Sequence, residues 1–524
     1  MTIQQSGREK IIKNELFMQK AEALKPNLIR TVNHPVSIIE TLKDENAIHG
    51  WKCNVIESAK ELITKAYGKG DSFILDFGTH HVGYLSMSIK PIGSPPDAPL
   101  RMRLTFGEMP VEVSEPFSEY NGWISSSWLQ EETIYVDVLP GIVHLPRRYS
   151  FRYLKVEILD TSSKYKVTFD DVFCNTVTSA DNKKIIHLES TDKELEKIDR
   201  VSIKTLENCM QDVFEDGPKR DRRLWLGDLR LQALANYETF GNNDLVKRCL
   251  YLFASVPNDR GQVSSNLLIE PYIIPDDTYL FDYSLFFATT LHDYYFATLD
   301  RETLDDLWPI AYRQIELALE RLDKNNVVMD SESLWTFIDW NLDINKQAPS
   351  QAILVYAMRK AEKMAIEIKE EDKASFLRNK INDVTKSAVE HLWDSEIGFF
   401  VSGSNHQVSW ASQIWMVIAG IFDEEESRLL MERLFDENPG IGLTTPYMNH
   451  HLVEALLIVG EKKKAISIIR QYWGGMIEYG ADTFWEIFNP DDKNYSPYGS
   501  YLINSYCHAW SCTPTYLIRK YNLI

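Results

Sequence analysis

Four segments of the sequence place carboxylates directly beside large aromatic side chains. They read DGPKRDRRLWLGD (216–228), IIPDDTYLFDYSLFF (273–287), LWTFIDWNLDI (334–344) and EYGADTFWEIFNPDDKNYSPYGS (478–500). Hydrolysis of a glycosidic bond needs one protonated carboxyl group and one ionised carboxylate, and aromatic walls help to keep the first one protonated. The four segments are therefore candidates for the lining of a sugar-binding active site.

The first segment has a structural interpretation and a functional one. Its opening tripeptide DGP (216–218) is a common turn into a helix, and the arginines that follow could be solvated partners of nearby acids. The end of the segment resists this interpretation, because Trp225 and Asp228 flank a glycine that permits close approach of backbone or ligand. We therefore keep the segment as a candidate site.

Glu486 is the sharper candidate. It follows Phe484 and Trp485 directly, in a stretch that turns at Gly480 and at an Asn-Pro pair. A glutamate in such apolar surroundings could be a half-buried structural residue paired with an arginine. A catalytic role is favoured once the first segment is counted as its partner.

Three further positions are weaker candidates. Asp282 caps the helix that follows it or binds a ligand. The pair Asp339 and Trp340 is a sugar-binding pair, or an ion-paired surface acid beside a packed ring. His508, between aromatic residues, is a ligand-binding histidine or a core histidine with its hydrogen bonds satisfied.

Other kinds of chemistry find no anchor in the sequence. The histidines near 406 and 450 lack the HExxH spacing or any other metal-ligand spacing, so no metal is expected. No GxSxG, P-loop or strand-linked GxGxxG motif occurs, which argues against serine hydrolases, nucleotide hydrolases and dinucleotide enzymes. We expect no cofactor.

The composition of the chain argues against some classes of binding partner. A formal net charge of −20 over 524 residues, with no basic patch, argues against nucleic acid. No apolar run approaches the roughly 20 residues that span a bilayer, and the N-terminus lacks a secretory apolar core, so we expect a cytoplasmic protein without a membrane partner. The six scattered cysteines are expected to be free thiols.

The hydropathy pattern divides the chain. We expect a helical or irregular lead-in over 1–45 and, from the short alternating runs between 70 and 180, an antiparallel β-sandwich over 46–185. Thr191 and Glu194 are spaced as a capping box, which indicates a helical domain over 186–524. About twelve helical segments, the last at roughly 499–520, favour an (α/α)6 barrel with loop-borne chemistry at one end.

Taken together, these motifs resemble glycoside hydrolase family 78, the α-L-rhamnosidase family. The family has a D-C-P-x-R-(D/E)-E-R-x-G-W-x-G-D motif, a later (T/V)-x-W-E and a terminal S-x-x-H-A-W-like segment, which here read DGPKRDRRLWLGD, TFWE and INSYCHAWSCTPTYL. LDFGTHHVGYLSMSI and LPRRYSFRYLKVEI resemble strings of the family's sandwich domain. The resemblance covers roughly 70–520 and implies a β-sandwich followed by an (α/α)6 barrel, in a short member without the usual C-terminal β-domain.

The resemblance also implies roles for individual residues. Glu486 takes the place of the general base, and Asp221 stands where the family usually has the glutamate that acts as general acid. This alignment counts back from Asp228, because the chain lacks one residue between the arginines and Trp225. The substrate-binding candidates are Asp216, Arg220, Trp225, Asp228, Asp282, Asp339, Trp340, Trp485 and His508.

The function that the resemblance implies is inverting exo-hydrolysis of terminal α-L-rhamnose, or a related L-sugar, from small glycosides or oligosaccharides. A barrel enzyme of other specificity or chemistry, such as a uronyl hydrolase or lyase, is the first alternative. A catalytically silent carbohydrate-binding homologue is the second, because an aspartate is one methylene shorter than a glutamate and such a displacement can cost ~100-fold in rate.

Overall fold

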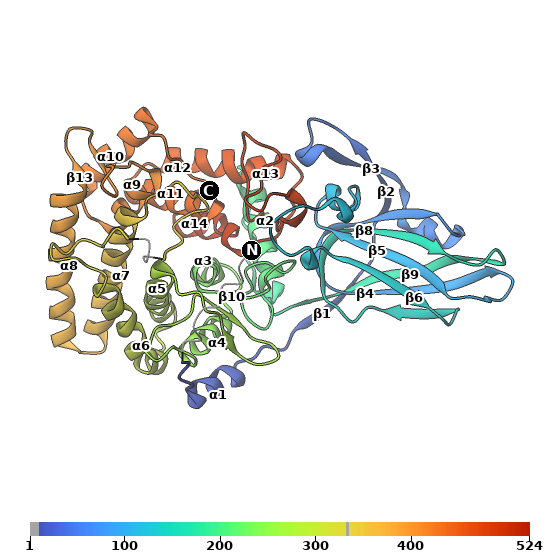
Figure 1. Ribbon diagram of the computed structural model, residues 1–524, viewed down its shortest axis with the longest axis horizontal. Helices are drawn as coiled ribbons and strands as arrows, with labels where there is room; N and C mark the ends of the chain where they lie inside the picture. The colour runs from blue at the N-terminus through green and yellow to red at the C-terminus, as the bar shows by residue number, and fades with distance from the viewer. Residues whose placement is uncertain (1–9, 332–334) are drawn as a thin grey trace.

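A computed structural model describes residues 10–331 and 335–524 of the chain. Figure 1 shows an elongated molecule with a β-sheet domain at one end and a helical domain at the other. Leu334, the first residue of one candidate segment, lies outside the described residues. Within them, no helix combines the length and the apolar character needed to cross a membrane.

The β-sheet domain is antiparallel throughout its nine described strands. The strand order is β1-β9-β4-β8-β5-β6, while β2 pairs with β3 and β4, and β7 pairs with β4. Their bounds are β1 Ile29–Asn33, β2 Ser37–Lys43, β3 Trp51–Ser58, β4 Ser72–Gly93, β5 Leu100–Gly107, β6 Glu131–Val136, β7 Gly141–His144, β8 Tyr149–Asp160 and β9 Tyr165–Thr178.

One long strand, β4, connects the layers of this domain. Its first part pairs with β2 and β8, its second part pairs with β7 and β9, and the register to β8 shifts between Asp76 and His81. The sheet can therefore fold around one apolar core, to which alternate residues such as Leu75, Leu85 and Leu104 contribute. The period-two pattern of the sequence reflects this burial, and the predicted antiparallel β-domain is confirmed.

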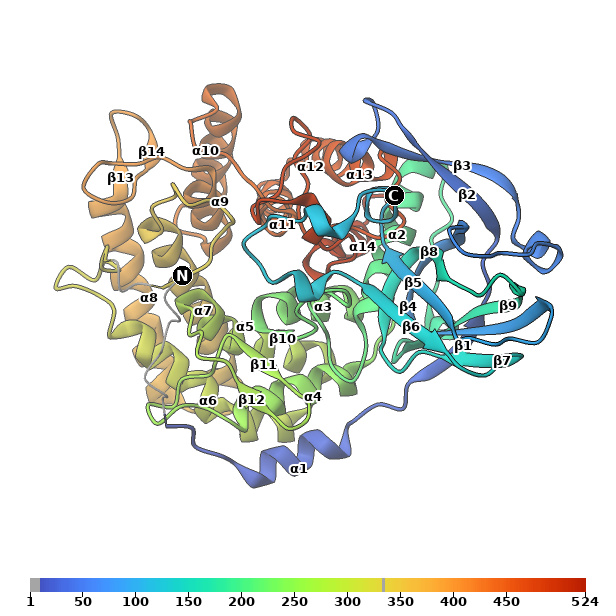
Figure 2. The ribbon, with the colours of Figure 1, turned by 45° about the vertical axis from the view of Figure 1, so that its right-hand side comes forward.

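The lead-in is shorter than we expected. Helix α1 (Glu15–Ala23) packs on helix α4 (Asn243–Ala254) of the other domain, as Figure 2 shows, but β1 and β2 are already strands of the sheet. β1 is exposed along most of its length, so its sequence has no alternation that would mark it as a strand. The assignment of residues 29–33 and 37–43 to a helical or irregular lead-in was wrong.

The helical domain consists of an inner and an outer ring. The inner helices α3, α5, α7, α9 and α11 contact each other in succession, and α14 contacts both α3 and α11. Their bounds are α3 Leu226–Tyr237, α5 Phe281–Thr298, α7 Gln347–Glu367, α9 Trp410–Ala419, α11 Pro446–Ile458 and α14 Pro514–Lys520. The outer helices are α2 Lys193–Cys209, α4 Asn243–Ala254, α6 Arg301–Leu319, α8 Glu371–Leu392, α10 Glu424–Glu437 and α12 Lys462–Ile469, which a π-turn continues into α13 Gly475–Glu478.

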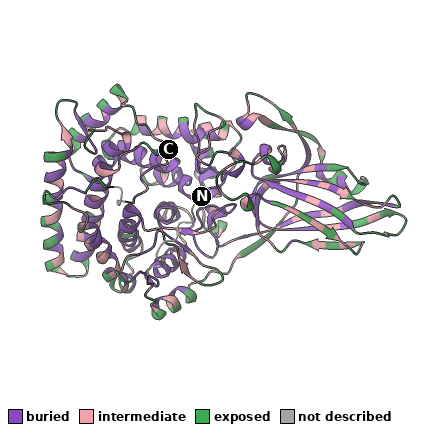
Figure 3. Cartoon of the chain, viewed as in Figure 1, coloured by how far each residue is buried: buried purple, intermediate pink, exposed green. Residues whose placement is uncertain are grey.

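Burial separates the two rings. The inner helices are buried on nearly every side, as α9 illustrates with its sequence WASQIWMVIA, whereas the outer helix α8 buries one stripe at Ala374, Leu377, Ile381, Val384 and Ala388. Figure 3 shows the same difference, with buried inner helices and outer helices that are exposed on one side. Six inner and six outer helices in the described residues fulfil the prediction of about twelve.

Two local predictions fail in this domain. Helix α2 is capped by Asp192, whose side chain accepts from the backbone N–H of Leu195 at 3.2 Å, and not by a capping box at Thr191. The segment 499–520 is not one helix: two 3₁₀ turns at Tyr501–Ile503 and Ala509–Ser511 precede α14, which starts at Pro514 because a proline is suited to the first helical turn.

Five short strands lie within the described part of the helical domain. β10 Leu224–Trp225, β11 Asn266–Leu268 and β12 Ile274–Pro275 form a small sheet beside the inner helices, and β13 Trp393–Asp394 pairs with β14 Phe399–Phe400.

All six cysteines are free and five of them are buried, as we expected.

Candidate active site

The loop between α2 and β10 closes on itself at Asp216. The side-chain Oδ1 of Asp216 accepts from the N–H of Arg223 at 2.9 Å, and its own N–H donates to the Arg223 carbonyl at 3.0 Å. Within this closed loop Asp221 and Arg222 both have left-handed backbone conformations, with φ of 64° and 51°. Two successive non-glycine residues in this region are strained, and such strain is concentrated at functional sites.

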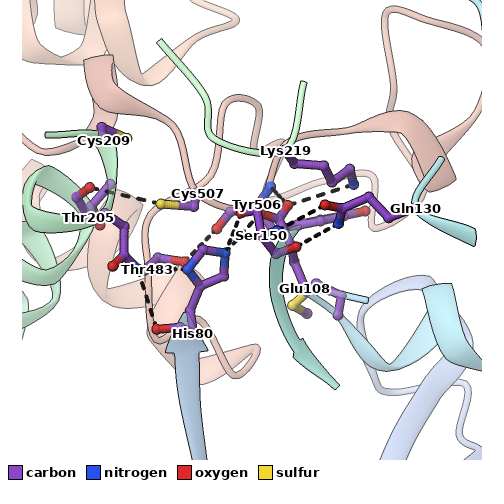
Figure 4. A network of polar contacts seen from close by, with 12 residues as sticks. His80, Glu108, Gln130, Ser150, Thr205, Cys209, Lys219, Thr483, Tyr506 and Cys507 are labelled. Carbon is purple, nitrogen blue, oxygen red and sulfur yellow. Dashed lines mark hydrogen bonds and ion pairs between the residues drawn. The ribbon is translucent and has the colours of Figure 1, made fainter. Parts of the chain in front are cut away.

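Lys219 fastens the same loop to the β-sheet domain. Its Nζ lies 2.6 Å from Glu112 Oε1 and 3.6 Å from Glu108 Oε2, and it donates to the carbonyl of Asn504 at 2.5 Å. All three charged side chains are buried. Figure 4 shows Lys219 reaching toward Glu108 at the junction of the domains.

Glu108 is the centre of this buried network. It also binds the His80 ring at 2.9 Å, the Ser150 hydroxyl at 2.8 Å and the backbone N–H of Tyr506 at 2.7 Å. Burial alone would raise the pKa of Glu108, but the positive charges of Lys219 and His80 outweigh it and lower that pKa. The sheet domain therefore holds the back of the loop whose front carries Arg220 and Asp221.

Glu486 is fixed by two partners. Its carboxylate forms an ion pair with the Arg220 guanidinium and accepts a hydrogen bond from the Tyr498 hydroxyl, while that guanidinium lies 4.4 Å from the centre of the Tyr498 ring. Burial alone would raise the pKa of Glu486, but Arg220 outweighs it and, with the Tyr498 hydrogen bond, lowers the pKa. Glu486 is therefore an ionised carboxylate in a buried setting.

Asp221 lies on the other side of the same guanidinium. Its Oδ1 is 3.5 Å from Arg220 Nη1, and 26% of its side chain is exposed, compared with 4% for Glu486. One arginine thus contacts both carboxylates that the sequence singled out. The two differ in burial and in how firmly they are held.

Asp216, Asp228 and His508 form a buried polar group beside this pair. Asp228 Oδ1 and His508 Nδ1 are 3.6 Å apart, and neither atom has a hydrogen-bond partner among the described residues. Burial is the main cause that raises the pKa of Asp216 and of Asp228 well above their usual range, and nearby carboxylates add to it. Burial lowers the pKa of His508 to about 4. The protein therefore leaves the hydrogen-bonding capacity of Asp228 Oδ1 and His508 Nδ1 unused among the described residues.

Aromatic rings border the site. Trp340 and Tyr498 meet at 5.9 Å with their planes near perpendicular, Phe337 packs on Trp340 at 5.5 Å, and Trp225 meets Tyr283 at 6.2 Å. The indole N–H of Trp340 has no partner among the described residues. Sequence reasoning did not single out Tyr283, Phe337 or Tyr498, although each lies inside one of the four quoted segments.

Gly227 leaves room for one of these aromatic rings. A Cβ atom at this position would lie 2.3 Å from Cζ of Tyr283, so the glycine is required by the approach of a protein ring. The close approach that the sequence indicated is therefore a contact with Tyr283.

The structure places three candidates in supporting positions. Asp282 accepts from the N–H groups of Phe337 and Ile338, both at 3.1 Å, and so holds the loop that carries Trp340. Asp339 accepts from the N–H of Thr444 at 2.8 Å and from the Thr445 hydroxyl at 2.6 Å, and burial raises its pKa to about 6. These oxygens are engaged by the protein.

Trp485 is the third of these candidates. Its ring is buried and packs edge-on against Phe488 and Tyr506. It therefore fixes the segment that carries Glu486 and lies in the core beneath it.

One cluster in the described residues has the composition of a metal site. The potential ligand atoms of His450, His451 and Glu454 lie within 4.8 Å of one another. However, His451 Nδ1 donates to the Tyr447 carbonyl at 2.7 Å, and His451 Nε2 accepts from the guanidinium of Arg230 at 2.9 Å. This ring has no lone pair left for a cation, and Arg230 supplies the positive charge.

Both domains match domain families of known proteins. Residues 35–176 match the glycosyl hydrolase family 78 alpha-rhamnosidase N-terminal domain, and residues 183–521 match the bacterial alpha-L-rhamnosidase 6 hairpin glycosidase domain. No curated protein matches the chain in sequence.

Solved structures extend the comparison. A rhamnosidase from Klebsiella oxytoca, solved with rhamnose bound, is 48% identical over 98% of this chain and 100% of that chain, with a TM-score of 0.96. The GH78 family rhamnosidase of Bacillus sp. GL1 is 19% identical over 91% of this chain and 50% of its own, with a TM-score of 0.73. The α-L-rhamnosidase of Streptomyces avermitilis, complexed with L-rhamnose, is 15% identical over 94% of this chain and 44% of its own, with a TM-score of 0.64.

The last two share the fold, whereas the first also shares much of the sequence. This chain is a glycoside hydrolase and belongs to glycoside hydrolase family 78, the α-L-rhamnosidase family.

Proposed function

We propose that this chain removes a terminal α-L-rhamnose, or a related L-sugar, from a glycoside by inverting hydrolysis, with Asp221 as general acid and Glu486 as general base. The observation that carries the proposal is the guanidinium of Arg220, which contacts both carboxylates. Because one guanidinium spans the gap, the two groups are no further apart than the ~9.5 Å that limits inverting glycosidases.

Glu486 is suited to the role of base. Arg220 and Tyr498 keep its carboxylate ionised and immobile, so it is ready to accept a proton from a water molecule. As that proton moves to Glu486, the water oxygen forms a bond to the anomeric carbon of the sugar. The bond forms on the face opposite to the leaving group, which inverts the configuration.

We assign the role of acid to Asp221 from its position, because it lies at the longer contact of Arg220 and is partly exposed, whereas Glu486 is buried. Its proton passes to the glycosidic oxygen as the bond between this oxygen and the anomeric carbon breaks, and the leaving group departs as a neutral alcohol. The partial exposure of Asp221 allows it to recover a proton from solvent after each turnover. Its left-handed backbone conformation fixes the point from which the short side chain reaches the substrate.

The sugar is held by the buried polar group and the rings. The unpartnered atoms of Asp228 and His508 and the indole N–H of Trp340 offer hydrogen bonds to hydroxyl groups, and Trp340 with Tyr498 offers flat apolar surface. The Klebsiella oxytoca relative was solved with rhamnose bound, which supports an L-rhamnose substrate here.

A panel of 4-nitrophenyl glycosides tests the proposal. We expect release of 4-nitrophenol from the α-L-rhamnoside above the other pyranosides, and proton NMR at early times should detect the β-anomer of the free sugar first. Turnover of another glycoside but not of the rhamnoside would contradict the proposed substrate and leave the proposed mechanism in place. Sugar binding without turnover of any glycoside would identify a silent binding homologue.

A further inference from the structure

Asp221 also lines a cavity at the junction of the two domains. The cavity has a volume of about 410 Å³, within the range in which proteins bind small molecules. The sheet domain contributes Tyr84 and Arg148 to its wall, and the helical domain contributes Asp221, Arg222 and the segment 268–270. Since the proposed general acid faces the leaving oxygen, a cavity beside Asp221 is positioned for whatever the sugar is attached to.

The cations around this cavity are not equally paired. Arg148 forms an ion pair with Glu215 in which its Nη2 donates to both carboxylate oxygens, at 2.8 and 2.7 Å, and Arg223 lies 3.3 Å from Asp276. Arg222 differs, because its Nε and Nη2 are buried and have no hydrogen-bond partner among the described residues. A buried donor without a partner is costly, and more so when it is charged.

The acids that border the cavity do not balance Arg222. Glu215 is occupied by Arg148, and Asp212 lies 3.2 Å from Lys25. Glu270 is exposed at the rim. The positive charge of Arg148 also repels that of Arg222, and after burial it is the largest cause that lowers the pKa of Arg222 to about 10. Arg222 is therefore a guanidinium beside the cavity that forms no ion pair of its own among the described residues, and Glu215, which attracts it, is already paired with Arg148.

The backbone conformation connects this guanidinium to the chemistry. Asp221 and Arg222 are the two successive left-handed residues of the loop, and both border the same cavity. The edge of a planar guanidinium that carries Nε and Nη2 matches the two oxygens of a carboxylate. In Arg222 both nitrogens are buried without a partner among the described residues, so a carboxylate in the cavity would bind them once the side chain turns toward it. The strained pair thus sets a proton donor and an anion receptor next to each other.

We propose that this cavity is the leaving-group subsite and that Arg222 selects leaving groups with a carboxylate, of which a uronic acid is the simplest sugar example. The inference rests on the proposed function, because it needs Asp221 to face the glycosidic oxygen. The remaining wall, with Leu268, Ile269 and the Tyr84 ring, supplies apolar surface for the body of a sugar ring.

The test compares two substrates that differ in one group. α-L-Rhamnosyl-galacturonic acid and its methyl ester present the same ring with and without the negative charge. For the wild-type protein we expect kcat/KM to favour the acid by about 10- to 100-fold, the range that a charge-assisted hydrogen bond provides. In Arg222→Gln we expect the ratio to fall to about one, and in Arg222→Lys to an intermediate value.

Controls separate the possible failures. Arg101→Gln removes the same charge from an exposed position on β5 and should leave the ratio unchanged. Thermal unfolding of each variant shows whether Arg222→Gln folds, and inhibition of 4-nitrophenyl rhamnoside hydrolysis by free galacturonate against free galactose reads the subsite independently in the wild type.

Each outcome has one meaning. If the wild type hydrolyses the galacturonic acid substrate no faster than its methyl ester, or if the preference persists in Arg222→Gln, the proposed subsite is wrong. Either result leaves the proposed rhamnosidase activity in place. A preference for a sulfated leaving group without one for the uronate overturns the carboxylate assignment. No turnover of any rhamnoside overturns the proposed function itself.

Discussion

The two carboxylates that Arg220 connects are held in opposite ways. Glu486 is buried, ion-paired and hydrogen-bonded, and it belongs to a segment fixed by the helical domain. Asp221 is partly exposed, contacts Arg220 only at 3.5 Å, and lies on a strained loop that the sheet domain fastens through Lys219. A base must be ionised when the substrate binds, which fixed partners ensure, whereas an acid must regain its proton before the next turnover, which contact with solvent allows.

The largest effect should come from the buried side of this comparison. Glu486→Gln keeps the shape and the hydrogen-bond acceptor but removes the charge that takes the proton from water. We expect kcat/KM for 4-nitrophenyl α-L-rhamnoside to fall by about 10³- to 10⁴-fold, at the upper end for a general base. Glu478→Gln, an exposed position eight residues earlier, is the control. A Glu486→Gln variant that keeps a tenth of the activity would remove Glu486 from the mechanism.

Replacement of the partly exposed Asp221 should reduce kcat/KM by an amount that depends on the leaving group of the substrate. In Asp221→Asn no proton can be donated, so alkyl rhamnosides should lose about 10³-fold in kcat/KM. The 4-nitrophenyl rhamnoside should lose about 10-fold or less, because its leaving group departs without protonation. The ratio of the two losses is the measurement, and the exposed Asp259→Asn is the control. Equal losses on both substrates would mean that Asp221 only positions its neighbours.

The comparison also explains what the sequence could predict. Alternation in β4 and β8 and the helical patterns after residue 190 reflect local burial, so both domains could be predicted. Strand β1 and the broken segment 499–520 could not, because pairing partners and turns far along the chain decide them. Within the site, Glu486, Arg220, Asp221, Asp228 and His508 converge.

The supporting residues show the limit of such predictions. Asp282, Asp339 and Trp485 have the same types and neighbours in sequence as binding residues, and only the fold shows that their atoms are engaged by the protein. The link from Lys219 to Glu108 and Glu112 joins residues more than one hundred positions apart, so no local pattern indicates it.

Removing Lys219 tests whether the sheet domain holds the acid loop. Lys219→Met leaves Glu112 buried without its cation and Glu108 with His80 alone, and we expect the free energy of unfolding to fall by about 3 kcal/mol. Glu112→Gln in the same chain should restore part of this loss, because one uncompensated charge is removed. Denaturant unfolding of the single and double variants measures it, with the exposed Lys184→Met as control. Equal unfolding free energies for Lys219→Met and wild type would show that the fastening is not needed.

The smallest effect concerns the partner of Glu486. The hydrogen bond from Tyr498 lowers the pKa of Glu486, so Tyr498→Phe should raise that pKa and protonate the base at higher pH. The acid limb of kcat/KM against pH should therefore move upward, by about one pH unit or less, while the alkaline limb, which reports the acid, stays in place. Tyr479→Phe, a half-buried tyrosine outside the site, is the matched control. A shift of the alkaline limb alone would assign Tyr498 to Asp221, and would reverse the distinction between a fixed base and an accessible acid.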